Sequence, residues 1–209
     1  MVAPRHPNPF VCNAGIPASP LMCTRPDLHG TITANTRAQL NTMTWAQIRA
    51  WTKLLIAADW LEATNHRLSF RGFEESWFCS QQTCRKENSE AFAGQHAAHG
   101  TSFFVLDEAS AIPDVIFDVA EGGMTDGEPM IFAFGNPTRS SGRFYEAVCG
   151  KSRHIWNHRS IDSRTSALTN KPLIEEWIDQ HRLDSDFVRS GYSAFHPMLR
   201  RVSSSTCSA

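Results

Sequence analysis

The chain has 209 residues, of which 41% are hydrophobic and 20% are charged, as expected for one folded domain and not for a disordered protein. Lysine plus arginine number 20 against 21 aspartate plus glutamate, so composition gives no basic excess of the kind that indicates nucleic-acid binding. No apolar run reaches the roughly 18 residues that a membrane-spanning helix needs, so we expect a soluble protein.

The amino-terminal segment and the cysteines indicate no export signal and no metal site. Five prolines precede residue 21, which predicts an irregular tail over residues 1 to about 28 without the apolar core of a secretory signal. The six cysteines lack the paired CxxC spacing of a zinc site, and we expect free thiols. Cys79 and Cys84 are expected to be loop thiols, with a metal or disulfide role as the minor alternative.

The first elements in chain order are a strand, a helix and a hairpin. Thr31, Ile32 and Thr33 predict a short strand that ends in a polar loop at Asn35 and Thr36. Apolar residues at three- and four-residue steps predict an amphipathic helix over residues 44–61, with Thr44 as N-cap and the tryptophans in the core. Residues 66–78 predict a hairpin with Gly72 at the turn.

The following elements predict a βαβ unit. The apolar run Phe103 to Leu106 is typical of a buried parallel strand, a helix is expected behind Pro113, and Met130 to Phe134 predicts a second buried strand. This rhythm favours an α/β fold with an open, mostly parallel sheet. A further strand is expected to lead to Asp162, followed by a helix in KPLIEEWIDQH and, beyond Arg189, a disordered tail.

The segment FFVLDEAS gives the strongest chemical signal. Its apolar strand delivers Asp107 and Glu108 to the carboxyl edge of the sheet, where ligands of α/β proteins bind. In such a Walker B arrangement, Asp107 can hold a nucleotide-bound magnesium ion through its water shell, and Glu108 can polarise the attacking water. The alternative is an acid that merely stabilises the start of the next helix.

The segment FGNPTR follows the next buried strand and presents Asn136 and Thr138 toward the same edge. The Asn136 amide both donates and accepts hydrogen bonds, so it can orient water or sense a γ-phosphate. The alternative is a plain Gly-Asn-Pro turn. Arg139 and Arg143 are open between a phosphate or DNA contact and ordinary surface charge.

Other candidate sites are weaker. His96 and His99 can share a helical face but have no third ligand at zinc spacing. Ser102 lies in no GxSxG elbow, so a hydrolase triad is not indicated. Asp162 is expected to end a strand, with a place near the nucleotide as the alternative.

The motifs TANTRAQL, NSEAFAG, VLDEASAIPD, FGNPTR and IDSR, in this order, resemble the large terminase subunits of tailed phages and prophages over about Thr24 to Arg189. The resemblance implies a P-loop ATPase fold, with magnesium and ATP bound at Asp107 and Thr138, and Glu108 and Asn136 as catalytic and coupling residues. It also implies double-stranded DNA, the small terminase subunit and the portal protein as partners, in the cytoplasm of a bacterial host.

The chain departs from the family pattern in two ways. No glycine-rich loop ending in Gly-Lys-Ser or Gly-Lys-Thr occurs in residues 1–23, and the first lysine is Lys53. Only a serine-rich tail follows where the family continues into a nuclease domain. We therefore expect a partial ATPase domain over residues 29–189, without the Walker A strand, loop and helix, a tail over 190–209, and doubtful activity. The alternatives are a non-enzymatic prophage remnant that contacts other packaging subunits, and another P-loop DNA-dependent ATPase of the repair or helicase type.

Overall fold

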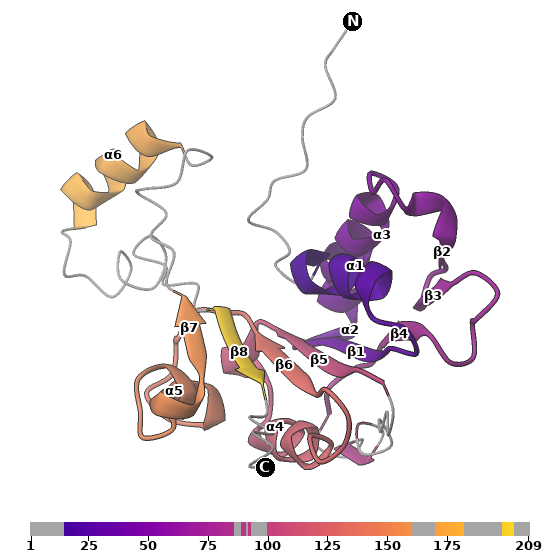
Figure 1. The fold of residues 1–209 in the computed structure, drawn as a ribbon. Coiled ribbons are helices and arrows are strands. Elements are labelled where there is room, and N and C mark those ends of the chain that lie inside the picture. The colour runs from indigo at the N-terminus through magenta and orange to yellow at the C-terminus, as the bar shows by residue number, and fades with distance from the viewer. Residues whose placement is uncertain are drawn as a thin grey trace, which may run out of the picture.

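The structure is a computed structural model that describes residues 15–85, 89–90, 92, 100–159, 170–181 and 198–202. These residues form an open sheet of eight strands in the order β2-β3-β4-β1-β5-β6-β8-β7 (Figure 1). The strands are β1 (His29–Ala34), β2 (Leu61–Ala63), β3 (Arg67–Phe70), β4 (Phe78–Gln81), β5 (Ser102–Asp107), β6 (Met130–Ala133), β7 (Asn157–Arg159) and β8 (Met198–Val202). The helices are α1 (Gly15–Thr24), α2 (Arg37–Gln39), the π-helix η1 (Leu40–Trp45), α3 (Ala46–Thr52), the 3₁₀-helices η2 (Ala58–Trp60), η4 (Ala109–Ala111) and η5 (Arg153–Ile155), α4 (Asp114–Gly122), α5 (Arg143–Val148) and α6 (Lys171–His181).

The four central strands, β4, β1, β5 and β6, run parallel, and the strands on both flanks pair antiparallel. All six residues of β5 are buried, because β1 and β6 pair with its two edges and helices cover both of its faces. The α/β class and the open sheet predicted from the sequence are confirmed. The predicted strands at residues 103–106 and 130–134 and the helix behind Pro113 are confirmed as β5, β6 and α4.

Two hydrophobic clusters pack against opposite faces of the sheet. On one face, Met22 of α1 and Ile48 of α3 pack with the β5 residues Phe103 and Val105. On the other face, α4 and α5 pack on Phe104 and Leu106 and their neighbours. Figure 1 shows the same division, with α1 and α3 on one side of the sheet and α4 and α5 on the other. Successive side chains of the central strands therefore contribute alternately to two hydrophobic cores.

The helix α1 and the strand β8 correct the predicted tails at both ends of the chain. Residues 15–24 are helical despite Pro20, and Ala18 and Met22 are fully buried in the core. Burial of this face outweighs the backbone hydrogen bond that an internal proline removes. Residues 198–202 form a strand that pairs antiparallel with β6 and β7. The predicted tail residues 1–14, 190–197 and 203–209 lie outside the described residues.

The predicted helix over residues 44–61 is wrong at both ends. The helical run begins after Thr36, whose hydroxyl caps it by accepting from the Gln39 amide at 3.1 Å, and α3 ends at Thr52. Thr44 is thus internal to the run and is not an N-cap. Leu61 lies in β2, where it pairs with Phe70 of β3.

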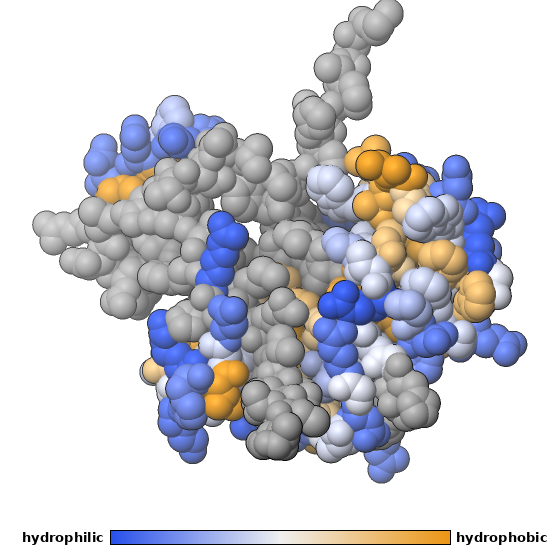
Figure 2. Space-filling model, in the orientation of Figure 1, coloured by the Kyte–Doolittle hydropathy of each residue, from blue (hydrophilic) through white to orange (hydrophobic). Residues whose placement is uncertain are grey.

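Part of the predicted apolar helix face is exposed. Trp45 and Ile48 are buried, but Trp51 is 39% and Leu54 68% exposed. Figure 2 shows apolar side chains gathered over the part of the molecule formed by α3 and the β2–β3 segment. The exposed large apolar residues there are Met43, Trp51, Leu54, Ile56, Trp60 and Phe73.

Several shorter predictions are also tested. The predicted hairpin is confirmed as β3 and β4, with Gly72 at a φ of 83° between them. The helix predicted in KPLIEEWIDQH is confirmed as α6. Cys79 is not a loop thiol but a buried residue of β4, and burial raises the pKa of its thiol to about 12.

Candidate active site

The strand β5 positions the two predicted acidic residues differently. Asp107 is the last residue of β5 and is only 9% exposed, whereas Glu108 follows it on the surface. Glu108 adopts a left-handed backbone conformation, with φ 54° and ψ 46°, before η4 begins. A residue with a long side chain rarely takes this conformation, and such outliers gather at functional sites. The turn separates an inward carboxylate from an outward one.

The Asp107 carboxylate has a hydrogen-bond partner that the sequence did not indicate. The Thr44 hydroxyl in η1 donates to Asp107 Oδ2 at 2.6 Å, within the buried part of the molecule. Burial raises the pKa of Asp107 to about 6; the Thr44 hydrogen bond opposes this shift, and the charge of Glu108 adds to it. A cation bound at this carboxylate would favour its ionised form.

The loop after β6 lies directly against the loop after β5. The parallel pairing of these strands continues past β6, where the Phe134 amide donates to Leu106 O at 2.9 Å and the Ala109 amide donates to Phe134 O at 2.8 Å. A Cβ atom on Gly135 would lie only 2.9 Å from the Ala109 nitrogen. The glycine of FGNPTR therefore permits the close approach of the two loops.

Asn136 and Thr138 emerge from this contact. Asn136 is partly buried, and its carbonyl accepts from the Thr138 amide at 2.8 Å. The exposed Thr138 hydroxyl lies 3.1 Å from the hydroxyl of Ser110 in η4. The structure therefore brings the segments that carry Asp107, Glu108, Asn136 and Thr138 to the same edge of the sheet.

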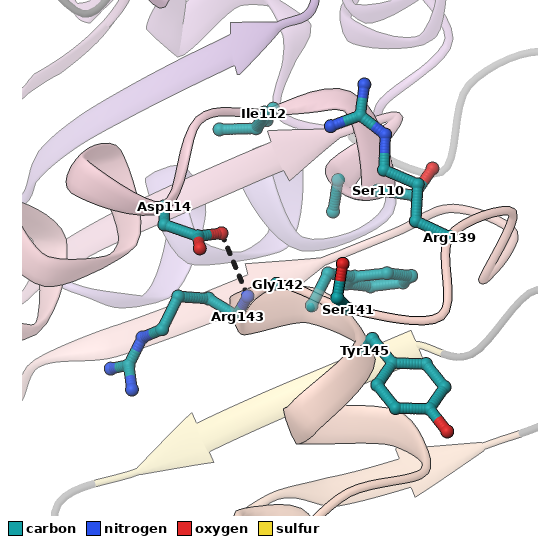
Figure 3. Close-up of a pocket in the computed structure, with 10 residues that line it drawn as sticks. Ser110, Ile112, Asp114, Arg139, Ser141, Gly142, Arg143 and Tyr145 are labelled. Carbon is teal, nitrogen blue, oxygen red and sulfur yellow. Dashed lines mark hydrogen bonds between the residues drawn. The ribbon is translucent and has the colours of Figure 1, made fainter.

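The two arginines of the second loop differ in their surroundings. Arg143 forms ion pairs with Asp118 at 3.2 Å and Glu121 at 2.5 Å, so its charge is used to join α5 to α4. Figure 3 shows its backbone nitrogen bonded to Asp114, at 2.9 Å. Arg139 is exposed and lines the same small pocket as Ser110. Of the two, Arg139 forms no ion pair with the described residues.

Among the remaining sequence candidates, the structure describes Ser102 but not the two histidines or Asp162. His96, His99 and Asp162 lie outside the described residues. Ser102 is a buried residue of β5. Among the residues that the structure describes, no group of three or more histidine, cysteine or acidic side chains could hold a metal ion. The helices in the same residues include none that is long and apolar enough to cross a membrane.

Thr44 is the site residue that the sequence analysis missed as such. The sequence analysis assigned Thr44 to a helix start because threonine is a common N-cap. Nothing in the sequence linked it to Asp107, which lies 63 residues further along the chain. One signal is visible in the sequence: Thr44 is a polar residue on the apolar side of a helical run. The structure shows that it is fully buried. A buried hydroxyl needs a partner, which here is the carboxylate.

The fold and the site define an α/β protein whose central strand delivers a buried and an exposed carboxylate to the ligand-binding edge of the sheet. No protein-family model matches the chain. A probable terminase large subunit of Enterobacteria phage P7 is 39% identical over 71 residues, which are 34% of this chain and 14% of that protein. The chain is thus related to phage terminase large subunits, the family that its motifs indicate. The match spans only a small part of this relative's length.

A solved structure of the large terminase from a thermophilic bacteriophage can also be superposed on part of the chain. The alignment covers 62% of this chain and 32% of the other, with a TM-score of 0.43 and 11% sequence identity. Similarity of this size does not by itself establish a common fold.

Proposed function

We propose that this chain is part of a terminase large subunit and contributes the hydrolytic side of an ATPase site that drives DNA packaging. Asp107 holds magnesium through its water shell, Glu108 polarises the attacking water, and Asn136 couples hydrolysis to movement. Thr138 contacts the nucleotide. Double-stranded DNA is the translocated substrate, and the small terminase subunit and the portal protein are the assembly partners, in the cytoplasm of a bacterial host.

The observation that carries this proposal is the pair of acids at the end of β5. The raised pKa of the buried Asp107 marks a carboxylate that is costly to ionise without a cation, and Glu108 faces solvent beside it. The Gly135 contact holds the loop of Asn136 and Thr138 against the same turn. Relatedness to terminase large subunits supports assigning this chemistry to ATP.

The chain contains no lysine before Lys53. Its one Gly-Lys-Ser sequence, at residues 150–152, follows α5 and has Tyr145 in place of the first glycine of the P-loop pattern. Backbone amides and a lysine normally neutralise the β- and γ-phosphates, so we expect weak binding of magnesium-ATP by this polypeptide alone. Activity of the 209-residue chain is accordingly expected to be low.

The test is equilibrium binding of a fluorescent ATP analogue with and without magnesium, combined with ATP hydrolysis. We expect weak binding that magnesium strengthens, loss of the magnesium effect in Asp107→Asn, and retained binding without hydrolysis in Glu108→Gln. The exposed Glu75→Gln serves as a matched control. No magnesium-dependent binding in a chain that unfolds cooperatively would favour the non-enzymatic remnant instead.

A further inference from the structure

A second polar pocket lies at the same edge of the sheet, beyond the ends of β1 and β4. It has a volume of about 380 Å³, within the range of small-ligand sites. Its walls come from the start of the helical run after β1, from the residue before β3, and from the end of β4. Neither Asp107 nor Glu108 lines it. The carboxyl ends of neighbouring parallel strands are where α/β sheets bind ligands.

The pocket favours an anion. None of its seven lining residues, all in the described part of the chain, is acidic, and Arg37 is the one residue among them with a permanent charge. Arg37 is exposed, and its guanidinium pairs with no carboxylate of the described residues. A planar guanidinium binds phosphate oxygens in a bidentate manner.

Apart from the apolar Leu40, the remaining lining side chains both donate and accept hydrogen bonds. They are Asn41, His66, Gln81, Gln82 and Thr83. Gln81 Nε2 is an amide nitrogen, which can only donate, so His66 Nδ1 accepts from it at 2.6 Å; the second proton of the same nitrogen goes to Asn65 O at 2.9 Å. In that tautomer the proton of His66 is on Nε2, where it can be donated. The pocket thus offers amides and an imidazole beside a guanidinium.

Gln81 lines the pocket, and its side-chain oxygen is a buried acceptor that would meet a ligand once the amide turned toward the pocket. Its Oε1 atom is buried and accepts no hydrogen bond from the described residues. A buried acceptor of this kind costs free energy unless a ligand or water donates to it. An ionised phosphate ester has no hydrogen-bond donor of its own, whereas the edge of a nucleobase carries both donors and acceptors.

We propose that this pocket binds a nucleoside phosphate, with its phosphate on Arg37 and its base edge on the amides of Gln81 and Gln82. The unit can come from a free nucleotide or from a nucleic-acid strand, which share this chemistry. Because no carboxylate lines the pocket, binding requires no magnesium. The site is therefore separate from the proposed magnesium site at Asp107.

The test uses the 209-residue protein in excess EDTA, titrated with AMP in one arm and with a short single-stranded oligodeoxynucleotide in the other. Binding in either arm, weakened about tenfold by Arg37→Gln and unchanged by Arg153→Gln, is the expected result. The arm that binds more tightly identifies the source of the nucleotide. Arg153 is an exposed arginine outside the pocket and matches the change of charge.

A second variant controls for an effect of the Arg37→Gln substitution on folding. Gln82→Glu keeps the side-chain shape but places a negative charge in the pocket, so it should also weaken binding, while thermal unfolding stays as in the unaltered protein. No binding in EDTA, or equal binding by all variants, would overturn the proposal. If the unaltered protein showed no magnesium-dependent binding of the ATP analogue but still bound nucleotide in EDTA, the proposed function would be overturned and this pocket would stand.

Discussion

At the scale of single residues, the proposed ATPase chemistry depends most on Asp107. It closes β5, it is nearly buried, and it receives a hydrogen bond from Thr44. The run FFVLDE was sufficient to predict that an acid would leave a buried strand here. That Glu108 would be exposed while Asp107 is buried depends on the left-handed turn at Glu108, which no pattern in the sequence indicated.

The pKa of Asp107 predicts how stability depends on pH. An unfolded aspartate has a pKa of about 3.9, below the value of about 6 in the fold. The folded state therefore binds more protons in this interval, and the free energy of unfolding should fall as the pH rises from about 4 to about 6. Above pH about 6 the decrease in the free energy of unfolding caused by ionisation of Asp107 is complete, and it is on the order of 2–3 kcal/mol.

The variant Asp107→Asn removes this titration while the side-chain oxygen can still accept from Thr44. Without magnesium, we expect it to unfold at a higher urea concentration than the unaltered protein at pH about 7.5, and at nearly the same concentration at pH about 4. Asp59→Asn, at an exposed acid, is the control. Equal stability of Asp107→Asn and the unaltered protein at both pH values would contradict the assigned pKa.

At the scale of elements, the sequence predicted β5, α4 and β6 well because each is a local pattern with a clear stop. The predicted bounds of the helix after β1 were wrong because the apolar spacing continues past the point where the chain leaves the helix. Leu61 fits the helical spacing, yet its pairing with Phe70 in the sheet decides its conformation. Tertiary pairing here overrides the local period.

The contact between the loops after β5 and β6 gives a test of element packing. In Gly135→Ala, the new methyl group would meet the Ala109 backbone nitrogen at 2.9 Å and disturb the hydrogen bond from Ala109 to Phe134 O at 2.8 Å. Backbone cannot yield as a flexible side chain does, so we expect a loss of about 1–3 kcal/mol in the free energy of unfolding. Urea denaturation measures it.

Gly122→Ala is the matched control for this substitution. Gly122 ends α4, and an added Cβ meets nothing within 4 Å. Alanine has the higher helix propensity, so this change should be neutral or stabilise by up to about 1 kcal/mol. If both variants had the same stability, the close approach of the two loops would not exist in solution.

At the scale of the whole molecule, the central strands tie two cores into one unit. Phe117 of α4 is 1% exposed on one face of the sheet, and Trp45 is equally buried on the other. Because β5 contributes alternate side chains to both clusters, loss of packing on one face should weaken the other.

Phe117→Ala tests this coupling between the two faces. We expect a loss of about 3–5 kcal/mol, with tryptophan fluorescence and far-ultraviolet circular dichroism following one shared transition. The exposed Phe73→Ala should change stability little. Two separate transitions in Phe117→Ala would mean that the faces unfold independently.

The sequence by itself determined which short segments are buried strands and which polar residues follow them, because apolar runs and turn residues act locally. It also carried the motifs that relate the chain to terminase large subunits. Only the tertiary structure decided that β8 pairs with β6, that α1 packs into the core, and that Thr44 reaches Asp107. These contacts join residues far apart in the chain, and side-chain periodicity says which face is buried but not which partner covers it.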